Sequence, residues 1–291
     1  MCGIVGLHLR DPALEPQLGS LLESMLCPMA ERGPDSAGVA VYGDRRRVPE
    51  GHAVVSVLDA PRDLDVLLPY AAVTRAGQTT LVTAPDSPEA LVDNITAAAP
   101  EVTVVGAGND LTVYKGTGHP ATLAGVYGLA GAGGWQGLAH TRMATESAVN
   151  AAGCHPFSVG PDQCLVHNGS FANHATIRRE LEAEGVRFDS LNDSEVGARF
   201  IAARLAAGDD LDKALRLLCE RFDGFYTLLV TTADGFAVVR DAIACKPAII
   251  AEHPRWVAMA SEFRALAELP GIDEARLWEP EPERVYAWNR S

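Results

Sequence analysis

The sequence of 291 residues has no uninterrupted apolar run near the roughly 20 residues that cross a bilayer. It also has no basic, apolar segment at its start that would predict export. Basic residues are few, because 24 Lys and Arg stand against 38 Asp and Glu, a formal net charge of -14. That charge opposes nonspecific contact with nucleic acid and with anionic lipid. We therefore expect a cytoplasmic, soluble protein with no nucleic-acid partner and no membrane partner.

Paired cysteines are missing as well. The six cysteines, at positions 2, 27, 154, 164, 219 and 245, include no CxxC pair, which is typical of a reduced compartment. Cys154-His155 and Cys164 with His167 come nearest to a metal-ligand pattern. Zinc needs clustered ligands, and both histidines lie beside strand-like residues. We expect no metal site.

The composition is that of a globular protein, with 47% hydrophobic and 21% charged residues. Strands and helices are predicted in blocks, which favours an α+β fold with antiparallel sheets and helices on their outer faces. Strands are expected at 4–9, 39–42, 54–58, 80–83, 102–105, 135–139, from 164 into Asn168-Gly169, and at 225–231, 236–240, 248–251, 256–260 and 284–288. Helices are expected near 18–29, 63–72, 88–98, 174–185, 193–205 and 211–221. Gly106-Ala107-Gly108 reads as a plain turn, and Asn168-Gly169 as a corner before a helix.

Cys2 is the first candidate for chemistry. If Met1 is removed, Cys2 carries both a thiol nucleophile and a free α-amine, whose usual pKa of about 7.7–8.0 lets it act as a base. The alternative is that Cys2 is only a small apolar residue at the start of a strand.

Three further positions carry polar groups at the ends of predicted elements. Arg142 follows a strand and could present its planar fork to a carboxylate, or form a surface salt bridge. Asn168-Gly169 could expose a side-chain amide and an N–H together. Asp193 or Ser194 opens a helix, where the ordinary role is capping.

In order, these motifs resemble the class II glutamine amidotransferases, a family of N-terminal-nucleophile hydrolases. The resemblance covers almost the whole chain and rests on Cys2-Gly3-Ile4-Val5-Gly6, Arg32-Gly33-Pro34-Asp35-Ser36-Ala37-Gly38, His140-Thr141-Arg142, His167-Asn168-Gly169, Asn192-Asp193-Ser194-Glu195, Arg240-Asp241 with Lys246-Pro247, and Ala260-Ser261-Glu262 with Ala265-Leu266. It implies a four-layer αββα sandwich, in which two antiparallel sheets lie between helical layers. The chain would be one amidotransferase domain over 1–291, with an insertion at about 43–134.

The resemblance also implies roles for individual residues. Cys2 would attack the side-chain amide of glutamine and form a thioester, while Asn168 and Gly169 would form the oxyanion hole. Arg142 would bind the α-carboxylate of glutamine and Asp193 its α-ammonium, and Thr145 would line the same pocket. Met143 and Glu146 stand where relatives with a sugar-phosphate isomerase carry Trp and His, so that branch is disfavoured.

The sequence of residues 140–147 most resembles the corresponding segment of the glutaminase-type subunits of glutamate-synthase-like enzymes, including N-methylglutamate synthase. We therefore expect a hetero-oligomer in which a separate synthase subunit receives the ammonia. No cofactor is expected in this chain, and any FMN or iron–sulfur cluster would belong to partner subunits. Two alternatives stay open: a stand-alone amidase acting on a γ-glutamyl amide, and a catalytically silent structural subunit if Met1 is retained.

Overall fold

The strands form three antiparallel sheets in the computed structural model, which describes residues 2–143 and 149–290. Across those residues the largest sheet has seven strands, in the order β14-β12-β13-β1-β8-β2-β7. A second sheet has the order β15-β11-β10-β9, and a third has the order β4-β5-β3-β6. The strands are β1 Gly3–Leu9, β2 Ser36–Tyr42, β3 Ala53–Leu58, β4 Ala72–Ala76, β5 Thr79–Ala84, β6 Thr103–Gly108, β7 Leu111–Thr117, β8 Gln136–Arg142, β9 Cys164–Phe171, β10 Gly224–Thr231, β11 Gly235–Arg240, β12 Ile249–His253, β13 Trp256–Ala260, β14 Arg276–Trp278 and β15 Tyr286–Asn289.

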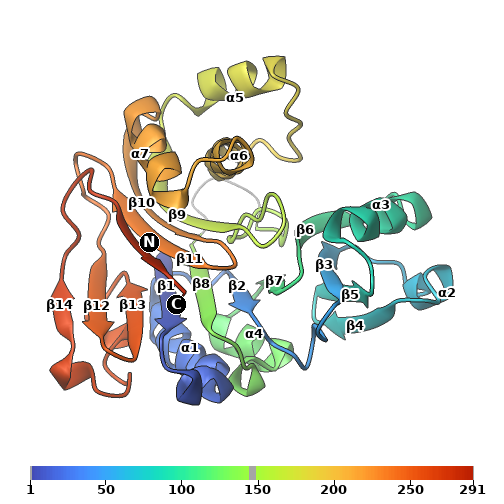
Figure 1. Ribbon diagram of the computed structural model, residues 1–291, viewed down its shortest axis with the longest axis horizontal. Helices are drawn as coiled ribbons and strands as arrows, with labels where there is room; N and C mark the ends of the chain where they lie inside the picture. The colour runs from blue at the N-terminus through green and yellow to red at the C-terminus, as the bar shows by residue number, and fades with distance from the viewer. Residues whose placement is uncertain (1, 144–148, 291) are drawn as a thin grey trace.

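Seven α-helices are described, and five of them cover the outer faces of the first two sheets, whereas the second and third lie with the third sheet (Figure 1). They are α1 Leu18–Leu26, α2 Leu64–Leu67, α3 Pro88–Ala98, α4 Pro120–Tyr127, α5 His174–Ala183, α6 Asp193–Ala206 and α7 Leu211–Arg221. One apolar cluster joins α1 and α4 to the seven-stranded sheet, and another joins α5, α6 and α7 to the β9–β11 side of the second sheet. A third cluster fills the space between these sheets. The expected four-layer αββα sandwich is confirmed, and no described helix is long and apolar enough to span a membrane.

Strand β1 shows how the sequence specifies the layers. Val5, Leu7 and Leu9 alternate onto the helical side of the sheet, while Ile4 faces the second sheet. Gly6 also faces the second sheet, and a Cβ on Gly6 would lie 2.3 Å from Leu229 Cδ2 and 3.0 Å from Phe236 Cε2. Glycine at this position therefore lets the two sheets approach closely beside the start of the chain.

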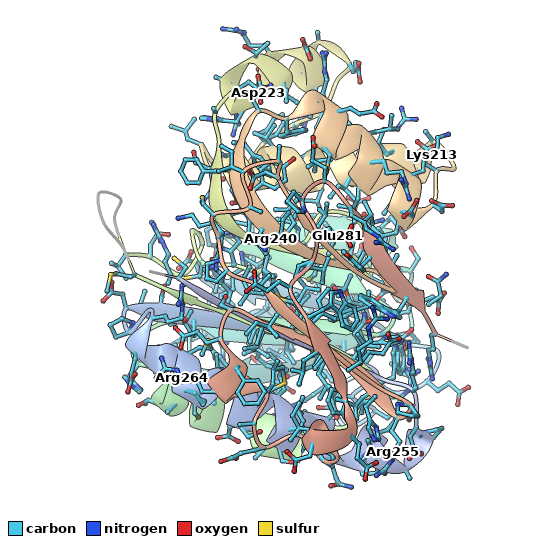
Figure 2. The ribbon with its side chains drawn as sticks, turned by 90° about the vertical axis from the view of Figure 1, so that its left-hand side faces the viewer. Lys213, Asp223, Arg240, Arg255, Arg264 and Glu281 are labelled. Carbon is cyan, nitrogen blue, oxygen red and sulfur yellow. The ribbon has the colours of Figure 1, made fainter. Side chains whose placement is uncertain are left out.

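The C-terminal segment closes one side of the sandwich. The Glu283 N–H donates to the Arg240 carbonyl over 2.9 Å, and β15 then pairs with β11. Figure 2 labels Arg240 and Glu281 where this segment crosses the second sheet. The expected last strand, 284–288, is thus found with a later start.

Residues 53–108 form a separate lobe, which holds the third sheet, α2 and α3 around an apolar cluster of its own (Figure 1). Helix α3 has both predicted ends, because Ser87 caps it by accepting from the Ala90 N–H and Pro88 occupies its first turn. The expected helix at 63–72 is wrong beyond the single turn of α2, because Ala72 starts β4. The expected turn at 106–108 is also wrong, because those residues pair with β3.

The lobe meets the seven-stranded sheet along its edge strand β7, and we call these contacts the lobe joint. Side-chain hydroxyls of the lobe accept hydrogen bonds from backbone N–H groups on the free edge of β7. The Ser56 hydroxyl accepts from the Val113 N–H over 3.0 Å, and the Thr79 hydroxyl accepts from the Lys115 N–H over 2.9 Å. The Thr79 hydroxyl also donates to the Lys115 carbonyl over 3.0 Å. An exposed strand edge invites pairing with other chains, and the lobe covers this one with hydroxyl groups.

The predicted insertion at 43–134 therefore contains two kinds of structure. Residues 53–108 make the lobe, whereas β7 belongs to the seven-stranded sheet and α4 to its helical layer. The limits of the insertion relative to other proteins stay a prediction.

Candidate active site

One cavity of about 500 Å³ gathers the candidate residues at the ends of β1, β8 and β9 and the start of α6. Five of the six predicted site residues line it: Cys2, Arg142, Asn168, Gly169 and Asp193. Thr145, the sixth, lies outside the described residues. Residues up to 191 positions apart in the chain thus meet at one place, as the family resemblance implied.

The backbone of Cys2 is held from two directions. Antiparallel pairing of Gly3 with Thr141 sets β1 beside β8, and the Arg32 Nε–H donates to the Cys2 carbonyl over 2.9 Å. Arg32 is itself fixed by Glu262, whose carboxylate lies 2.5 Å from its Nη1. Arg264, labelled in Figure 2, pairs with the other oxygen of Glu262 at 2.6 Å. This row of charges supports the strand end that carries the thiol.

The thiol of Cys2 has an altered acidity. Burial by itself raises its pKa, but a hydrogen bond and the charge at His140, with the backbone of Met143, lower the pKa of Cys2 to about 7. A large fraction is therefore thiolate at neutral pH, and the thiolate is the nucleophilic form.

His140 was quoted in the sequence motif without a role. The two-residue period of a strand places it on the same face of β8 as Arg142, and that signal could have identified it.

His140 also orients the amide of Asn168. Its Nε2 lies 3.0 Å from Asn168 Oδ1, so a proton on Nε2 makes that oxygen the acceptor. The NH₂ group of Asn168 then faces Cys2, with Nδ2 at 3.3 Å from the Cys2 carbonyl oxygen. Because β8 and β9 belong to different sheets, this contact joins the two halves of the sandwich at the candidate oxyanion hole.

Gly169 lies in a backbone conformation that disfavours other residues, with φ at 141°. A Cβ on Gly169 would lie 1.9 Å from the Phe225 carbonyl oxygen. The expected corner at Asn168-Gly169 is wrong, because β9 continues to Phe171 and both residues pair with β10. The following helix, α5, begins only at His174.

Opposite charges line the cavity at Arg142 and Asp193. Arg142 ends β8, and its guanidinium lies beside Gly153: a Cβ placed on Gly153 would be 3.4 Å from Arg142 Nη1. Asp193 opens α6, but Asn192 caps that helix by accepting from the Ser194 N–H over 2.9 Å. Asp193 Oδ2 instead accepts from the Phe171 N–H over 2.8 Å. Arg32 and Lys246 line the same cavity, so the described residues offer three cationic side chains and one carboxylate, Asp193, to the two charges of an α-amino acid.

Two buried histidines, which sequence reasoning considered only as metal ligands, form part of the wall. The Ser194 hydroxyl lies 3.0 Å from His155 Nε2 and 2.8 Å from His167 Nδ1. Burial lowers the pKa of His155 well below its usual value and that of His167 to about 4. Both rings are therefore neutral at physiological pH. The described residues include no group of three or more His, Cys, Asp or Glu placed to hold a metal ion.

This arrangement has the parts of an acyl-transfer site. A thiol of lowered pKa lies beside an oriented amide donor, and a charged pair lies in the same cavity. Such donors stabilise the oxyanion of a tetrahedral intermediate. The α-amine of Cys2, free once Met1 is removed, would act as the base.

Comparison with known sequences gives full-length relatives. A model of the glutamine amidotransferase domain matches residues 140–268. The chain is 48% identical over 300 residues to the glutamine amidotransferase-like protein GlxB of Rhizobium meliloti, covering 99% of this chain and 98% of that protein. It is 29% identical over 304 residues to a putative glutamine amidotransferase of Methanothermobacter thermautotrophicus, covering 98% and 99%.

Comparison with solved structures supports the fold. The allosteric regulatory enzyme of purine biosynthesis matches with a TM-score of 0.65 and 18% identity, over 99% of this chain and 47% of that one. Glutamine phosphoribosylpyrophosphate amidotransferase of B. subtilis, complexed with ADP and GMP, matches with a TM-score of 0.60 and 18% identity, over 100% and 49%. The chain spans about half the length of these two structures, and identities this low show the fold alone.

Proposed function

Because this chain belongs to the class II glutamine amidotransferases, we propose that it is a glutaminase subunit that releases ammonia from the side-chain amide of glutamine. The observation that carries the proposal is the contact across the two sheets, in which His140 turns the Asn168 amide towards Cys2. A structural subunit has no need of an amide donor held at the backbone of a cysteine whose thiol has a pKa of about 7.

The proposed reaction has two halves. The sulfur of Cys2 bonds to the side-chain carbonyl carbon of glutamine, and the carbonyl oxygen takes negative charge facing Asn168 and Gly169. The C–N bond then breaks, ammonia leaves with a proton from the α-ammonium of Cys2, and a thioester remains. Water, deprotonated by the same amine, attacks the thioester and releases glutamate and the thiol.

Arg142 and Asp193 would select free glutamine. Arg142 would pair with the α-carboxylate and Asp193 with the α-ammonium, groups that an amide inside a peptide does not carry. The neutral His155 and His167 add no competing charge to this pocket.

The acceptor of the ammonia is proposed to be a separate synthase subunit, because free ammonia escapes into water. The proposed complex is glutamate-synthase-like or an N-methylglutamate synthase, so that the whole assembly would act as a methylamine–glutamate N-methyltransferase. FMN and iron–sulfur clusters, where present, would lie in those partners. Purification of the native complex, identification of the chains that co-purify and a flavin absorbance spectrum would test this part.

A glutaminase assay tests the catalytic part. Cys2→Ala should abolish ammonia release, whereas Arg142→Ala and Asp193→Ala should raise KM for glutamine by at least about tenfold, since each loses a charge-assisted contact. Arg216→Ala is the matched control, because Arg216 pairs with Asp212 on exposed α7. Unchanged glutamine turnover in both pocket variants would favour the stand-alone amidase, which would then be assayed on γ-glutamyl amides.

The state of the first residue is tested separately by intact-mass spectrometry of the native protein. Loss of one methionine mass would leave the amine of Cys2 free for catalysis. A retained Met1 would instead favour the silent structural subunit.

A further inference from the structure

Lys115 is a buried cation for which the described residues provide no counter-ion. It lies on β7, its side chain is turned into the space between the sheets, and the residue is 2% exposed. Its ammonium makes no ion pair and no hydrogen bond with the described residues, and Nζ lies over the ring of Phe157, 4.7 Å from the ring centroid. A buried charge normally has a partner, so its absence here requires an explanation.

The neighbouring acidic groups do not supply that partner. Glu195 lines the same small cavity, but its oxygens accept from the Asp189 N–H, the Ser190 N–H and the Ser190 hydroxyl at 2.6–2.8 Å. Burial raises the pKa of Cys164 to about 12, so this nearby thiol is neutral. Glu195 therefore attracts Lys115 without forming an ion pair with it, and its oxygens are already hydrogen-bonded elsewhere.

Two adjoining cavities lie between Lys115 and the surface, beside the lobe and α6. The inner part, of about 60 Å³, is lined by Lys115, Phe157 and Glu195. The outer part, of about 370 Å³, is lined by apolar residues of α3 and β6, among them Val92 and Ala107. The two parts share Val104, Ser158, Val159, Asp189 and Arg199, which form the boundary between them.

We propose that this cavity, which we call the lobe cleft, binds a small organic carboxylate whose carboxylate group contacts the Lys115 ammonium. The inner part has room for one such group, and the apolar walls of the outer part would contact the remaining carbon atoms. Glu89, Asp93 and Asp189 also line the outer part, against one cation, Arg199. Because Arg199 already pairs with Asp189 and Glu195, the remaining carboxylates oppose a second negative charge there and favour an ammonium. The ligand class is therefore a monocarboxylate, and a small amino acid fits it best.

The cavity of about 500 Å³ around Cys2 is called the glutamine pocket below. The lobe cleft is distinct from it, because the two share no lining residue. They have a common wall, however. His155 and Ser194 face the glutamine pocket, while Phe157 and Glu195, one or two residues further on, face the cleft. A ligand in the cleft would therefore lie directly behind the residues that shape the glutamine pocket, and this proposal does not depend on the glutaminase assignment.

Calorimetry on the full chain tests the proposal with acetate, glycine and succinate as probes. Acetate and glycine should bind wild type, and Lys115→Met should weaken both by at least about tenfold, as expected for loss of a charge-assisted contact. Succinate should bind more weakly than acetate, because of Glu89 and Asp93. Ala107→Phe, which fills the outer part and keeps Lys115, should also remove binding and serves if Lys115→Met fails to fold.

Arg142→Ala is the control for binding at the glutamine pocket, and it should keep the response to both probes. The proposal is overturned if neither probe binds wild type, or if Lys115→Met binds as well as wild type. It is equally overturned if the response disappears in Arg142→Ala and persists in Ala107→Phe.

Discussion

The glutamine pocket and the lobe joint differ in whether their buried polar atoms are hydrogen-bonded. At the joint, the hydroxyls of Ser56 and Thr79 are fully buried, and each is hydrogen-bonded to the edge of β7. In the pocket, His155 Nδ1 and His167 Nε2 are buried with no partner among the described residues. Buried polar atoms without partners cost free energy, so they persist mainly where function requires them. The difference indicates that the joint serves stability and the pocket serves chemistry.

Asn168→Ala should give the largest effect. Removing one oxyanion donor should lower kcat for glutamine hydrolysis about a hundred- to a thousandfold. The loss of its buried contacts with His140, Cys2 and Ser261 should also lower the melting temperature. Steady-state kinetics and thermal unfolding measure the two quantities. Asn94→Ala, at an exposed position of α3, should change neither. A kcat close to that of wild type in folded Asn168→Ala would place this residue with the joint and not with the chemistry.

Acid should destabilise the protein through the pocket. The pKa of His167 is about 4 in the folded chain, because of burial, and about 6.5 in an unfolded chain. Between these values the unfolded state binds a proton that the folded state does not. Stability is therefore complete above about pH 6.5 and falls towards pH 4, by up to about 1.4 kcal/mol per pH unit for this one group.

Urea unfolding at several pH values measures that slope. His167→Gln should flatten it, whereas His119→Gln, at an exposed position, should not. Equal slopes in wild type and His167→Gln would show that the acid sensitivity arises elsewhere in the chain.

Asp162→Ala should affect stability without affecting chemistry. Its carboxylate accepts from the N–H groups of Asn109, Asp110 and Leu111 at 2.9–3.0 Å, which secures the turn between the lobe and β7. Losing these contacts should lower the free energy of unfolding by about 2–3 kcal/mol. Chemical denaturation gives this value, with exposed Asp65→Ala as the control. A large loss of kcat in the folded variant would contradict the separation of joint and pocket.

Thr79→Val should have the smallest effect of this series. The valine keeps the shape but leaves the Lys115 N–H and carbonyl without their partner, at a cost of about 1–2 kcal/mol. Thr80→Val is matched to it, since Thr80 is also buried and its hydroxyl has only a 3.5 Å contact from Arg75. Equal melting temperatures for the two variants would show that the hydroxyl cover of β7 contributes little.

Local signals in the sequence predicted the regular elements well where such signals are strong. Helices α3 and α7 begin and end at the predicted residues, because caps and amphipathic spacing mark them. Strand β7 was not predicted. Lys115 interrupts its apolar pattern, and its burial depends on the lobe and on Phe157 from distant parts of the chain.

The sequence by itself determined the family, the αββα layers and the five described residues that meet in the glutamine pocket. Ordered motifs and strand periodicity are local, so they are readable without coordinates, although the roles of the site residues stay predictions. Only the tertiary structure decided that His140 orients Asn168, that Asn192 and not Asp193 caps α6, and that Lys115 faces a cleft. Each of these depends on which side chains from separate elements come within hydrogen-bonding distance, and long-range packing sets that distance.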